Sequence, residues 1–153
     1  MHHELSLQAG EDHAFADATR HRVAAPAVLV VDDVRATRAG LAELLRLRRF
    51  HVYEAENGAE ALHVLRHHPH ICVVVLDLWM PGTDGFWFRA EQLRDPMLAH
   101  VPVVVFTGSA RDRDLAELKA ADVLLKPLSV DKLLDAISRH CGSTADDTGR
   151  DPL

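Results

Sequence analysis

Four short apolar runs in this chain each lead into side chains that could bind an ion or take part in group transfer. The side chains that follow these runs are Asp32 with Asp33, Asp77, Thr107 and Lys126. If the runs are parallel strands of one sheet, their carboxyl ends meet at the same edge, where α/β proteins bind ligands. One acidic residue after a strand is common, but five polar residues at one edge indicate a site.

The chemistry of this set is specific. Three carboxylates in one cleft repel one another unless a cation neutralises them, and Mg²⁺ suits carboxylate and carbonyl oxygens. Lys126 would supply positive charge for a phosphoryl oxygen, and the Thr107 hydroxyl could bind another oxygen. Asp77 is then the nucleophile that forms an aspartyl-phosphate. Phosphoryl transfer depends mainly on positioning and charge neutralisation, and these residues supply both.

Segments of helical periodicity alternate with the apolar runs. Strands are expected at 27–31, 51–55, 71–76, 101–106 and 123–125. The expected helices cover about 35–48, a segment opened by Asn57-Gly58 and ended by Pro69, a short stretch between Gly85 and Asp95, about 110–120, and a segment that begins after Ser129. This alternation predicts an α/β fold, with a five-stranded parallel sheet covered by helices on both faces.

Two helices have apolar faces that predict their orientation. Leu41, Leu44 and Leu45 form one stripe in the first helix. In the short helix after Gly85, the i, i+4, i+7 spacing predicts that Phe86, Ala90 and Leu93 point inward. Trp87 and Phe88 cannot both join that face, so one of them is expected to be exposed.

Composition indicates one globular domain. The chain has 153 residues, 48% of them apolar and 26% charged, and its net charge of −6 disfavours a nucleic-acid partner. Cys72 falls in a strand and Cys141 in an expected tail, which predicts reduced thiols. No apolar run is as long as a membrane-spanning helix, which needs about 20 residues. No secretory signal is visible. A cytoplasmic protein without a membrane partner is therefore expected.

We expect a mobile arm over 1–25, one domain over 26–141 and a disordered tail over 142–153.

Four motifs, in order, resemble the receiver domain of two-component response regulators. They are Val30-Val31-Asp32-Asp33, Leu76-Asp77-Leu78-Trp79-Met80-Pro81-Gly82, Thr107-Gly108 and Leu125-Lys126-Pro127. The resemblance covers about residues 27–140. It implies a flavodoxin-like fold with sheet order 2-1-3-4-5. It also implies phosphorylation of Asp77 by a histidine kinase or phosphotransfer protein, and signalling through a downstream protein target.

The resemblance also assigns roles to single residues. Asp33, Asp77 and the carbonyl of Trp79 would bind Mg²⁺ directly, and Asp32 would act through water. Lys126 and Thr107 would contact the phosphoryl group. The Lys126–Pro127 bond is often cis in this family. Such a domain is not an enzyme, apart from catalysing its own phosphoryl transfer and dephosphorylation, and it can form a homodimer when phosphorylated.

Three positions depart from the family pattern or modify it. Val123 stands where an aromatic residue commonly moves inward together with the threonine. Trp79 and Ser109 lie two residues beyond Asp77 and Thr107, at positions that tune hydrolysis of the phosphoryl group in this family. We hypothesise that the bulk of Trp79 restricts water access and lengthens the lifetime of the phosphorylated state.

Two alternatives compete with a phosphorylatable receiver. Val123 alone favours a pseudo-receiver that binds its partner constitutively. A hydrolase of the haloacid-dehalogenase type needs a second Asp two residues after the nucleophile, and Trp79 occupies that place. No output domain is expected in the arm or the tail, which leaves open a stand-alone receiver and a receiver from a longer protein.

Two further groups of residues have structural explanations. Arg46, Arg48 and Arg49 are expected to interact with the C-terminal end of the helix dipole. His67, His68 and His70 flank Pro69, and adjacent histidines around a proline rarely share one metal ion. We expect them to lie in a solvated loop.

Overall fold

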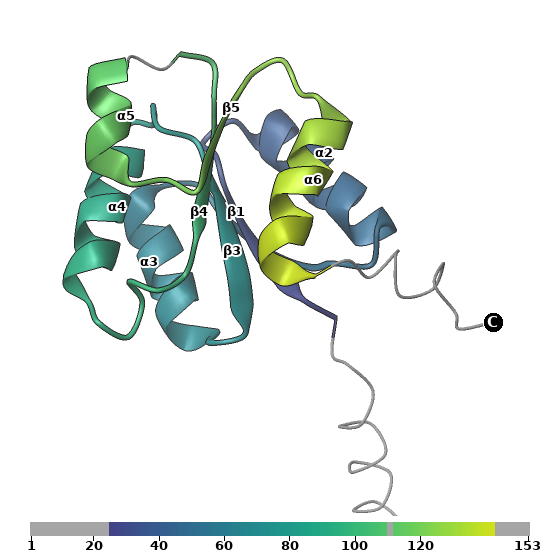
Figure 1. The fold of residues 1–153 in the computed structure, drawn as a ribbon, viewed down its shortest axis with the longest axis horizontal. Coiled ribbons are helices and arrows are strands. Elements are labelled where there is room, and N and C mark those ends of the chain that lie inside the picture. The colour runs from purple at the N-terminus through teal and green to yellow at the C-terminus, as the bar shows by residue number, and fades with distance from the viewer. Residues whose placement is uncertain (1–24, 110–111, 143–153) are drawn as a thin grey trace, which may run out of the picture.

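The structure is a computed structural model that describes residues 25–109 and 112–142. The expected arm and tail therefore lie outside the described residues, apart from Ala25 and Gly142. The elements, labelled in Figure 1, are β1 (Ala27–Val31), α2 (Arg35–Leu47), β2 (His51–Ala55), α3 (Gly58–His67), β3 (Ile71–Leu76), α4 (Gly85–Arg94), β4 (Val103–Thr107), α5 (Asp112–Leu118), β5 (Asp122–Leu125) and α6 (Val130–Cys141).

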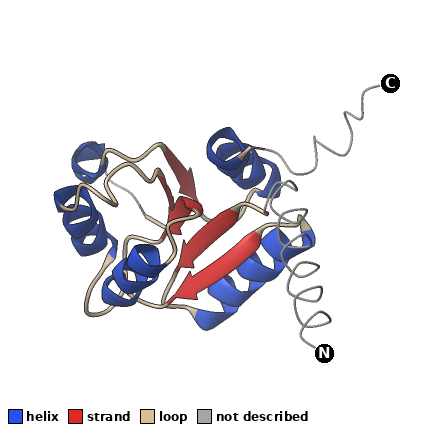
Figure 2. Cartoon of the chain, turned by 90° about the horizontal axis from the view of Figure 1, so that it is seen from below, coloured by secondary structure: helices blue, strands red, loops and turns tan. Residues whose placement is uncertain are grey.

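The strands form one parallel sheet in the order β2-β1-β3-β4-β5, as the resemblance implied. Helices cover both faces of this sheet (Figure 2). α2 and α6 pack on one face, and α3, α4 and α5 pack on the other. The carboxyl ends of the strands therefore share one edge, which is the arrangement the candidate site needs.

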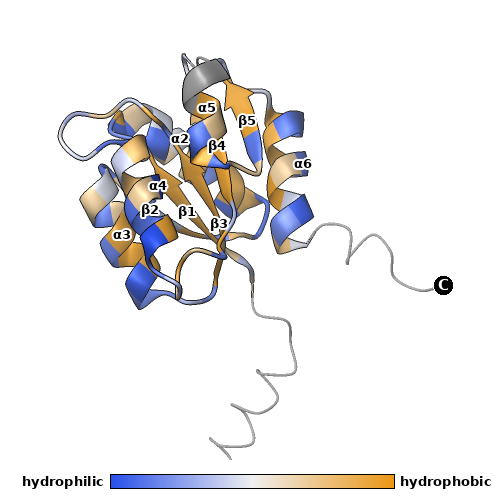
Figure 3. Cartoon of the chain, turned by 60° about the vertical axis from the view of Figure 1, so that its left-hand side comes forward, coloured by the Kyte–Doolittle hydropathy of each residue, from blue (hydrophilic) through white to orange (hydrophobic). Residues whose placement is uncertain are grey.

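Both faces of the central strands are buried. In β1, Leu29 and Val31 join the core under α3, α4 and α5, whereas Val28 and Val30 join the core under α2 and α6. β3 alternates in the same way. This explains why the central strands are continuous apolar runs rather than alternating ones, and Figure 3 shows the apolar strands between helices that mix hydrophilic and hydrophobic residues.

The predicted elements differ from the observed ones mainly at their ends. β4 begins at Val103 rather than at residue 101, because Pro102 has no backbone N–H to donate to the ladder. Asn57 caps α3, as expected, by accepting a hydrogen bond from the Glu60 N–H at 2.8 Å. Ser129 caps α6 by accepting from the Lys132 N–H at 3.5 Å.

The predicted inward face of α4 is wrong at Ala90, although Phe86 is half-buried and packs against the core. The helix buries Gly85, Phe88, Arg89 and Gln92, and Ala90 is exposed. A Cβ at Gly85 would lie 2.5 Å from the Asp77 carbonyl oxygen, so the start of α4 is pressed against the end of β3 and its rotation is fixed there. Of the aromatic pair, Phe88 is fully buried and Trp87 is exposed.

Arg89 and Gln92 can be buried because backbone carbonyls satisfy their donors. The Arg89 guanidinium donates to the Leu118 and Lys119 carbonyls at 2.7 and 2.9 Å. The Gln92 amide donates to two carbonyls in the segment before β4, at 3.0 and 2.9 Å. Burial lowers the pKa of Arg89.

The prediction of reduced thiols is also wrong. Cys72 and Cys141 form a disulfide, with their Cα atoms 5.3 Å apart. Cys141 is the last residue of α6 rather than part of a tail, and the packing of α6 on the sheet brings it beside β3. The two cysteines are separated by 69 positions, a spacing that gave no sign of the pairing.

The arginine and histidine groups also have specific contacts. Arg46 donates to the Val52 carbonyl at 3.0 Å and pairs with Glu54, contacts that the dipole argument did not foresee. His68 stacks on Tyr53 with ring centroids 4.0 Å apart, and His70 lies 2.9 Å from the Tyr53 hydroxyl.

No helix in the described part of the chain is long and apolar enough to cross a membrane.

Candidate functional site

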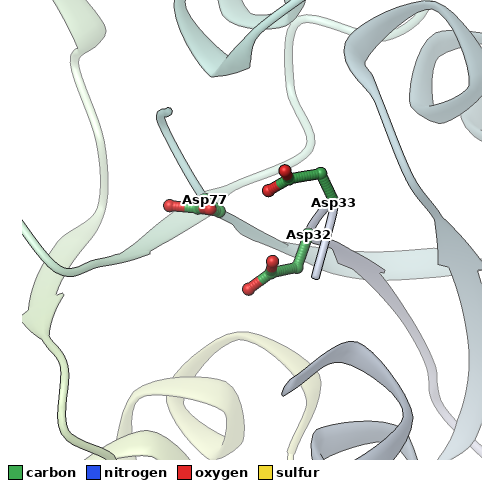
Figure 4. A group of neighbouring side chains, drawn as sticks. All are labelled: Asp32, Asp33 and Asp77. Carbon is green, nitrogen blue, oxygen red and sulfur yellow. The ribbon is translucent and has the colours of Figure 1, made fainter. Parts of the chain in front are cut away.

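The ends of β1 and β3 bring three carboxylates together. Asp32, Asp33 and Asp77 each offer one oxygen atom within 4.8 Å of the others. Figure 4 shows these side chains extending into the same region from two adjacent strands. The pairing of Val31 with Leu76 fixes this arrangement, and the Asp77 N–H donates to the Val31 carbonyl at 2.9 Å. Asp32 and Asp77 are buried, and Asp33 is half-buried.

Lys126 reaches this acidic group from the end of β5. Its Nζ lies 2.9 Å from Asp32 Oδ2 and 3.7 Å from Asp77 Oδ2. The Lys126–Pro127 peptide bond is cis, as expected from the family. The Lys126 N–H donates to the Thr107 carbonyl at 2.8 Å, so the lysine and the threonine are joined through the backbone. One ammonium group therefore faces two buried carboxylates.

The electrostatic environment of Asp77 is unfavourable to its charged form. Burial raises the pKa of the Asp77 carboxyl, and the Asp32 carboxylate raises it further. Lys126 and hydrogen bonds from the Trp79 N–H and the Thr107 hydroxyl lower the pKa, but burial outweighs them. A group that adds positive charge at this edge would therefore stabilise the ionised carboxylate.

A match to known proteins agrees with this geometry. The family model for the response regulator receiver domain matches residues 28–138. The chain belongs to the response regulator receiver family. The match spans most of the chain and includes every residue of the acidic group, together with Thr107 and Lys126.

Individual relatives agree with the family match. This receiver domain is 34% identical over 110 residues to the two-component response regulator ORR5 of Oryza sativa subsp. japonica, covering 70% of this chain and 82% of that protein. Its fold is similar to the crystal structure of a response regulator receiver protein from Pseudomonas putida. That similarity has a TM-score of 0.72 and 28% identity, over 76% of this chain and 98% of the other.

A second similar structure is a complex. The CheX-CheY-BeF3-Mg+2 complex from Borrelia burgdorferi contains a chain with 25% identity to this one and a TM-score of 0.67, over 74% of this chain and 87% of that chain.

In this receiver domain, two loops meet beside Asp77. Trp79, in the loop after β3, donates its indole Nε1–H to the Ser109 carbonyl at 2.7 Å. The Thr107 hydroxyl donates to the same carbonyl at 3.2 Å. The Trp79 ring also contacts Phe86 edge to face, with centroids 5.2 Å apart. The sequence identified these positions but gave no sign that one carbonyl accepts from both side chains.

Arg38 is a site residue that sequence reasoning missed. Its guanidinium donates to the Asp32 carbonyl at 2.8 Å and to Glu54 at 3.3 Å. The Asp32 carboxylate in turn accepts from the Val34 N–H at 2.9 Å. These contacts hold the backbone and side chain of Asp32 against α2 and β2. Arg38 belongs to none of the four motifs, so only the fold shows that it supports the site.

Proposed function

We propose that this receiver domain accepts a phosphoryl group on Asp77 and signals through phosphorylation-dependent binding of another protein. The observation that carries the proposal is the position of Lys126, whose ammonium group lies beside the carboxylates of both Asp32 and Asp77. A phosphoryl group on an Asp77 oxygen adds negative charge at this point. Lys126 can neutralise part of it by shifting its contact from Asp32 to a phosphoryl oxygen.

The donor is proposed to be a phosphohistidine of a histidine kinase or phosphotransfer protein. An Asp77 carboxylate oxygen attacks phosphorus, the P–N bond breaks, and the imidazole leaves with that electron pair. The Thr107 hydroxyl, which donates to the Ser109 carbonyl in this structure, is positioned to turn to a phosphoryl oxygen. The chain's own residues thus orient the nucleophile and bind the transferred group.

The acidic group fits Mg²⁺. Three carboxylates of which two are buried, with one lysine to balance them, form a hard-oxygen donor set with excess negative charge. We propose that Asp33, Asp77 and the Trp79 carbonyl bind the ion directly, and that Asp32 acts through water. When bound, Mg²⁺ neutralises charge on the phosphoryl oxygens during transfer. The pseudo-receiver alternative gains no support, because every side chain that the reaction needs is present at the site.

Acyl-phosphate labelling tests the phosphoacceptor. Incubation with a small acyl phosphate and Mg²⁺ should add one phosphoryl group, measured by intact mass, and chelation of the metal should prevent it. Asp77→Asn should abolish the addition. Asp84→Asn is the matched control, because the Asp84 carboxylate caps α4 by accepting from the Trp87 N–H at 2.9 Å, and asparagine caps equally well. Labelling of Asp77→Asn to the wild-type extent would exclude Asp77 as the acceptor.

The phosphorylated domain is proposed to bind another protein. The similar Borrelia structure is named as a complex with BeF3 and Mg+2, which supports a phosphorylation-dependent protein partner here. We also propose that phosphorylation can drive homodimerisation. Sedimentation of the protein with and without beryllofluoride and Mg²⁺ would show a change in mass if it does, and an unchanged monomer would exclude it.

A further inference from the structure

Trp79 makes a contact that packing alone does not require. The residue is 49% exposed, and its ring contacts Phe86, which a phenylalanine at position 79 could also do. The indole N–H instead crosses to the Ser109 carbonyl, 30 positions later in the chain. The side chain therefore links the loop after β3 to the loop after β4, directly beside Asp77.

The Ser109 carbonyl connects this tryptophan to the reacting group. It accepts hydrogen bonds from Trp79 Nε1 at 2.7 Å and from Thr107 Oγ1 at 3.2 Å. The Thr107 hydroxyl has a single proton, which it donates to the Ser109 carbonyl, and the same hydroxyl also lowers the pKa of the Asp77 carboxyl. If a phosphoryl oxygen on Asp77 takes that proton, the Ser109 carbonyl retains only the indole as a donor. The environment of Trp79 therefore depends on the partner of Thr107.

The side chain at position 123 cannot respond to a change in the hydrogen bond of Thr107. Val123 lies in β5, where it pairs with Val105, and its half-buried side chain has neither a ring nor a hydrogen-bond donor. Trp79 has both, and half of its surface faces solvent. A side chain with these properties can transmit the state of Thr107 to the molecular surface.

We propose that Trp79 is a positioning residue that holds the loop after β4 over Asp77 and responds to the hydrogen bond of Thr107 through the Ser109 carbonyl. Trp79 thereby links the state of Thr107 to the protein surface, a link that an aromatic residue at position 123 on β5 would otherwise supply. This inference rests on the proposed phosphorylation of Asp77 and adds the route by which its effect leaves the site.

Fluorescence in a single-tryptophan protein tests the coupling. The chain has two tryptophans, and Trp87→Phe leaves Trp79 as the only one. Beryllofluoride with Mg²⁺ is titrated while ¹⁹F NMR of the bound fluoride measures occupancy independently of tryptophan. Emission from Trp79 should change in proportion to occupancy.

Variants of Thr107 separate coupling from simple proximity. In the Trp87→Phe background, Thr107→Val should bind beryllofluoride about tenfold or more weakly, because a hydrogen bond to a charged group is lost. At saturation its emission change should be absent. Thr107→Ser retains the hydroxyl and should restore the change. An emission change in Thr107→Val equal to that of its parent at full occupancy would overturn the proposal.

Trp79→Phe tests the positioning role, since it keeps a ring against Phe86 and removes the N–H donor. Loss of the phosphoryl group, followed by intact mass, should become about two- to tenfold faster, as expected for the loss of one hydrogen bond. Trp87→Phe should lose the group at the wild-type rate. Equal rates for Trp79→Phe and wild type would contradict the role of the N–H.

The experiments distinguish failure of this inference from failure of the proposed function. If ¹⁹F NMR and acyl-phosphate labelling detect no occupancy of the wild-type site, both proposals fail. If the site is occupied and Trp79 does not follow Thr107, only the coupling through Ser109 fails.

Discussion

The two faces of the sheet are held by different kinds of interaction. Under α2 and α6 the buried core is apolar, and the Cys72–Cys141 disulfide joins α6 to β3. Under α3, α4 and α5 there is an apolar core as well, but it is supplemented by the buried side chains of Arg89 and Gln92. One face therefore relies on non-directional packing and a covalent link, and the other partly on directional hydrogen bonds.

This difference matters because α5, on the second face, follows the loop whose Ser109 carbonyl accepts from the Thr107 hydroxyl. The described part of the chain buries five polar side chains, of which three belong to the site: Asp32, Asp77 and Thr107. The other two, Arg89 and Gln92, hold the end of α5 and the segment before β4. α5 has only seven residues and follows the loop that contains Ser109. We expect α2 and α6 to remain fixed on phosphorylation and α5 to adjust.

The disulfide is expected to have the largest effect. Cys72→Ala with Cys141→Ala should lower the free energy of unfolding by about 2–4 kcal/mol, because the bond closes a long loop of the unfolded chain. Urea unfolding with and without a dithiol reductant measures this loss. The wild type should approach the variant when reduced, and the variant should not respond to the reductant. Two titratable thiols in native, unreduced protein would show that the bond is absent.

Removal of the Arg89 guanidinium tests the other face. Arg89→Met keeps most of the buried stem but leaves the Leu118 and Lys119 carbonyls without their donors. The free energy of unfolding should fall by about 2–3 kcal/mol, and amide exchange in α5 should accelerate more than in α6. Arg94→Met, on the exposed side of the same helix, should change stability by less than about 0.5 kcal/mol. Equal stability of the two variants would show that α5 does not depend on Arg89.

The sequence predicted what depends on local pattern. The strands that lead to the site are short apolar runs, and each of Asp77, Thr107 and Lys126 ends its strand or directly follows it, so these residues could be located without a structure. The sheet order came from the family resemblance and was confirmed. The predicted bounds changed by a few residues because the apolar pattern does not record where ladder hydrogen bonds begin.

Contacts between distant segments could not be predicted in this way. Periodicity assigned α4 an apolar face and missed Arg89, because a buried arginine is recognised only when the carbonyls that accept from it are known. The Cys72–Cys141 bond depends on where α6 ends against the sheet. The bond between Trp79 and Ser109 depends on how two loops approach each other. All three connect residues that no local motif relates.

The pH dependence of stability tests the site itself. Burial raises the pKa of Asp77 above 3.8, so between that value and the folded pKa the native state binds more protons than the unfolded state. The Asp77 contribution to stability is therefore lost as pH rises through this window. Asp77→Asn should exceed the wild type in unfolding free energy at neutral pH without divalent ions, and the excess should shrink on acidification. Mg²⁺ should reduce the difference in unfolding free energy between Asp77→Asn and wild type at neutral pH. If that difference does not vary with pH, the carboxyl charge does not have the proposed role.

The smallest expected effect separates the bulk of Trp79 from its hydrogen bond. Trp79→Asn removes both the ring that lies between the two loops and the indole N–H, whereas Trp79→Phe removes only the donor. Trp79→Phe is expected to lose the phosphoryl group about two- to tenfold faster than wild type, through the lost hydrogen bond alone. If the ring also restricts water access to the phosphoryl group, Trp79→Asn should lose that group faster still. Loss of the phosphoryl group is followed by intact mass after the acyl phosphate is removed.

The rates at which the Trp79 variants lose the phosphoryl group show what holds the loop after β4. If the two Trp79 variants are equally fast, the N–H alone holds the loop, and the hypothesis that bulk restricts water is wrong. If Trp79→Asn is no faster than wild type, neither property of Trp79 affects hydrolysis. The loop after β4 would then be held by its connection to α5, and Arg89→Met should accelerate loss of the phosphoryl group where the Trp79 variants do not.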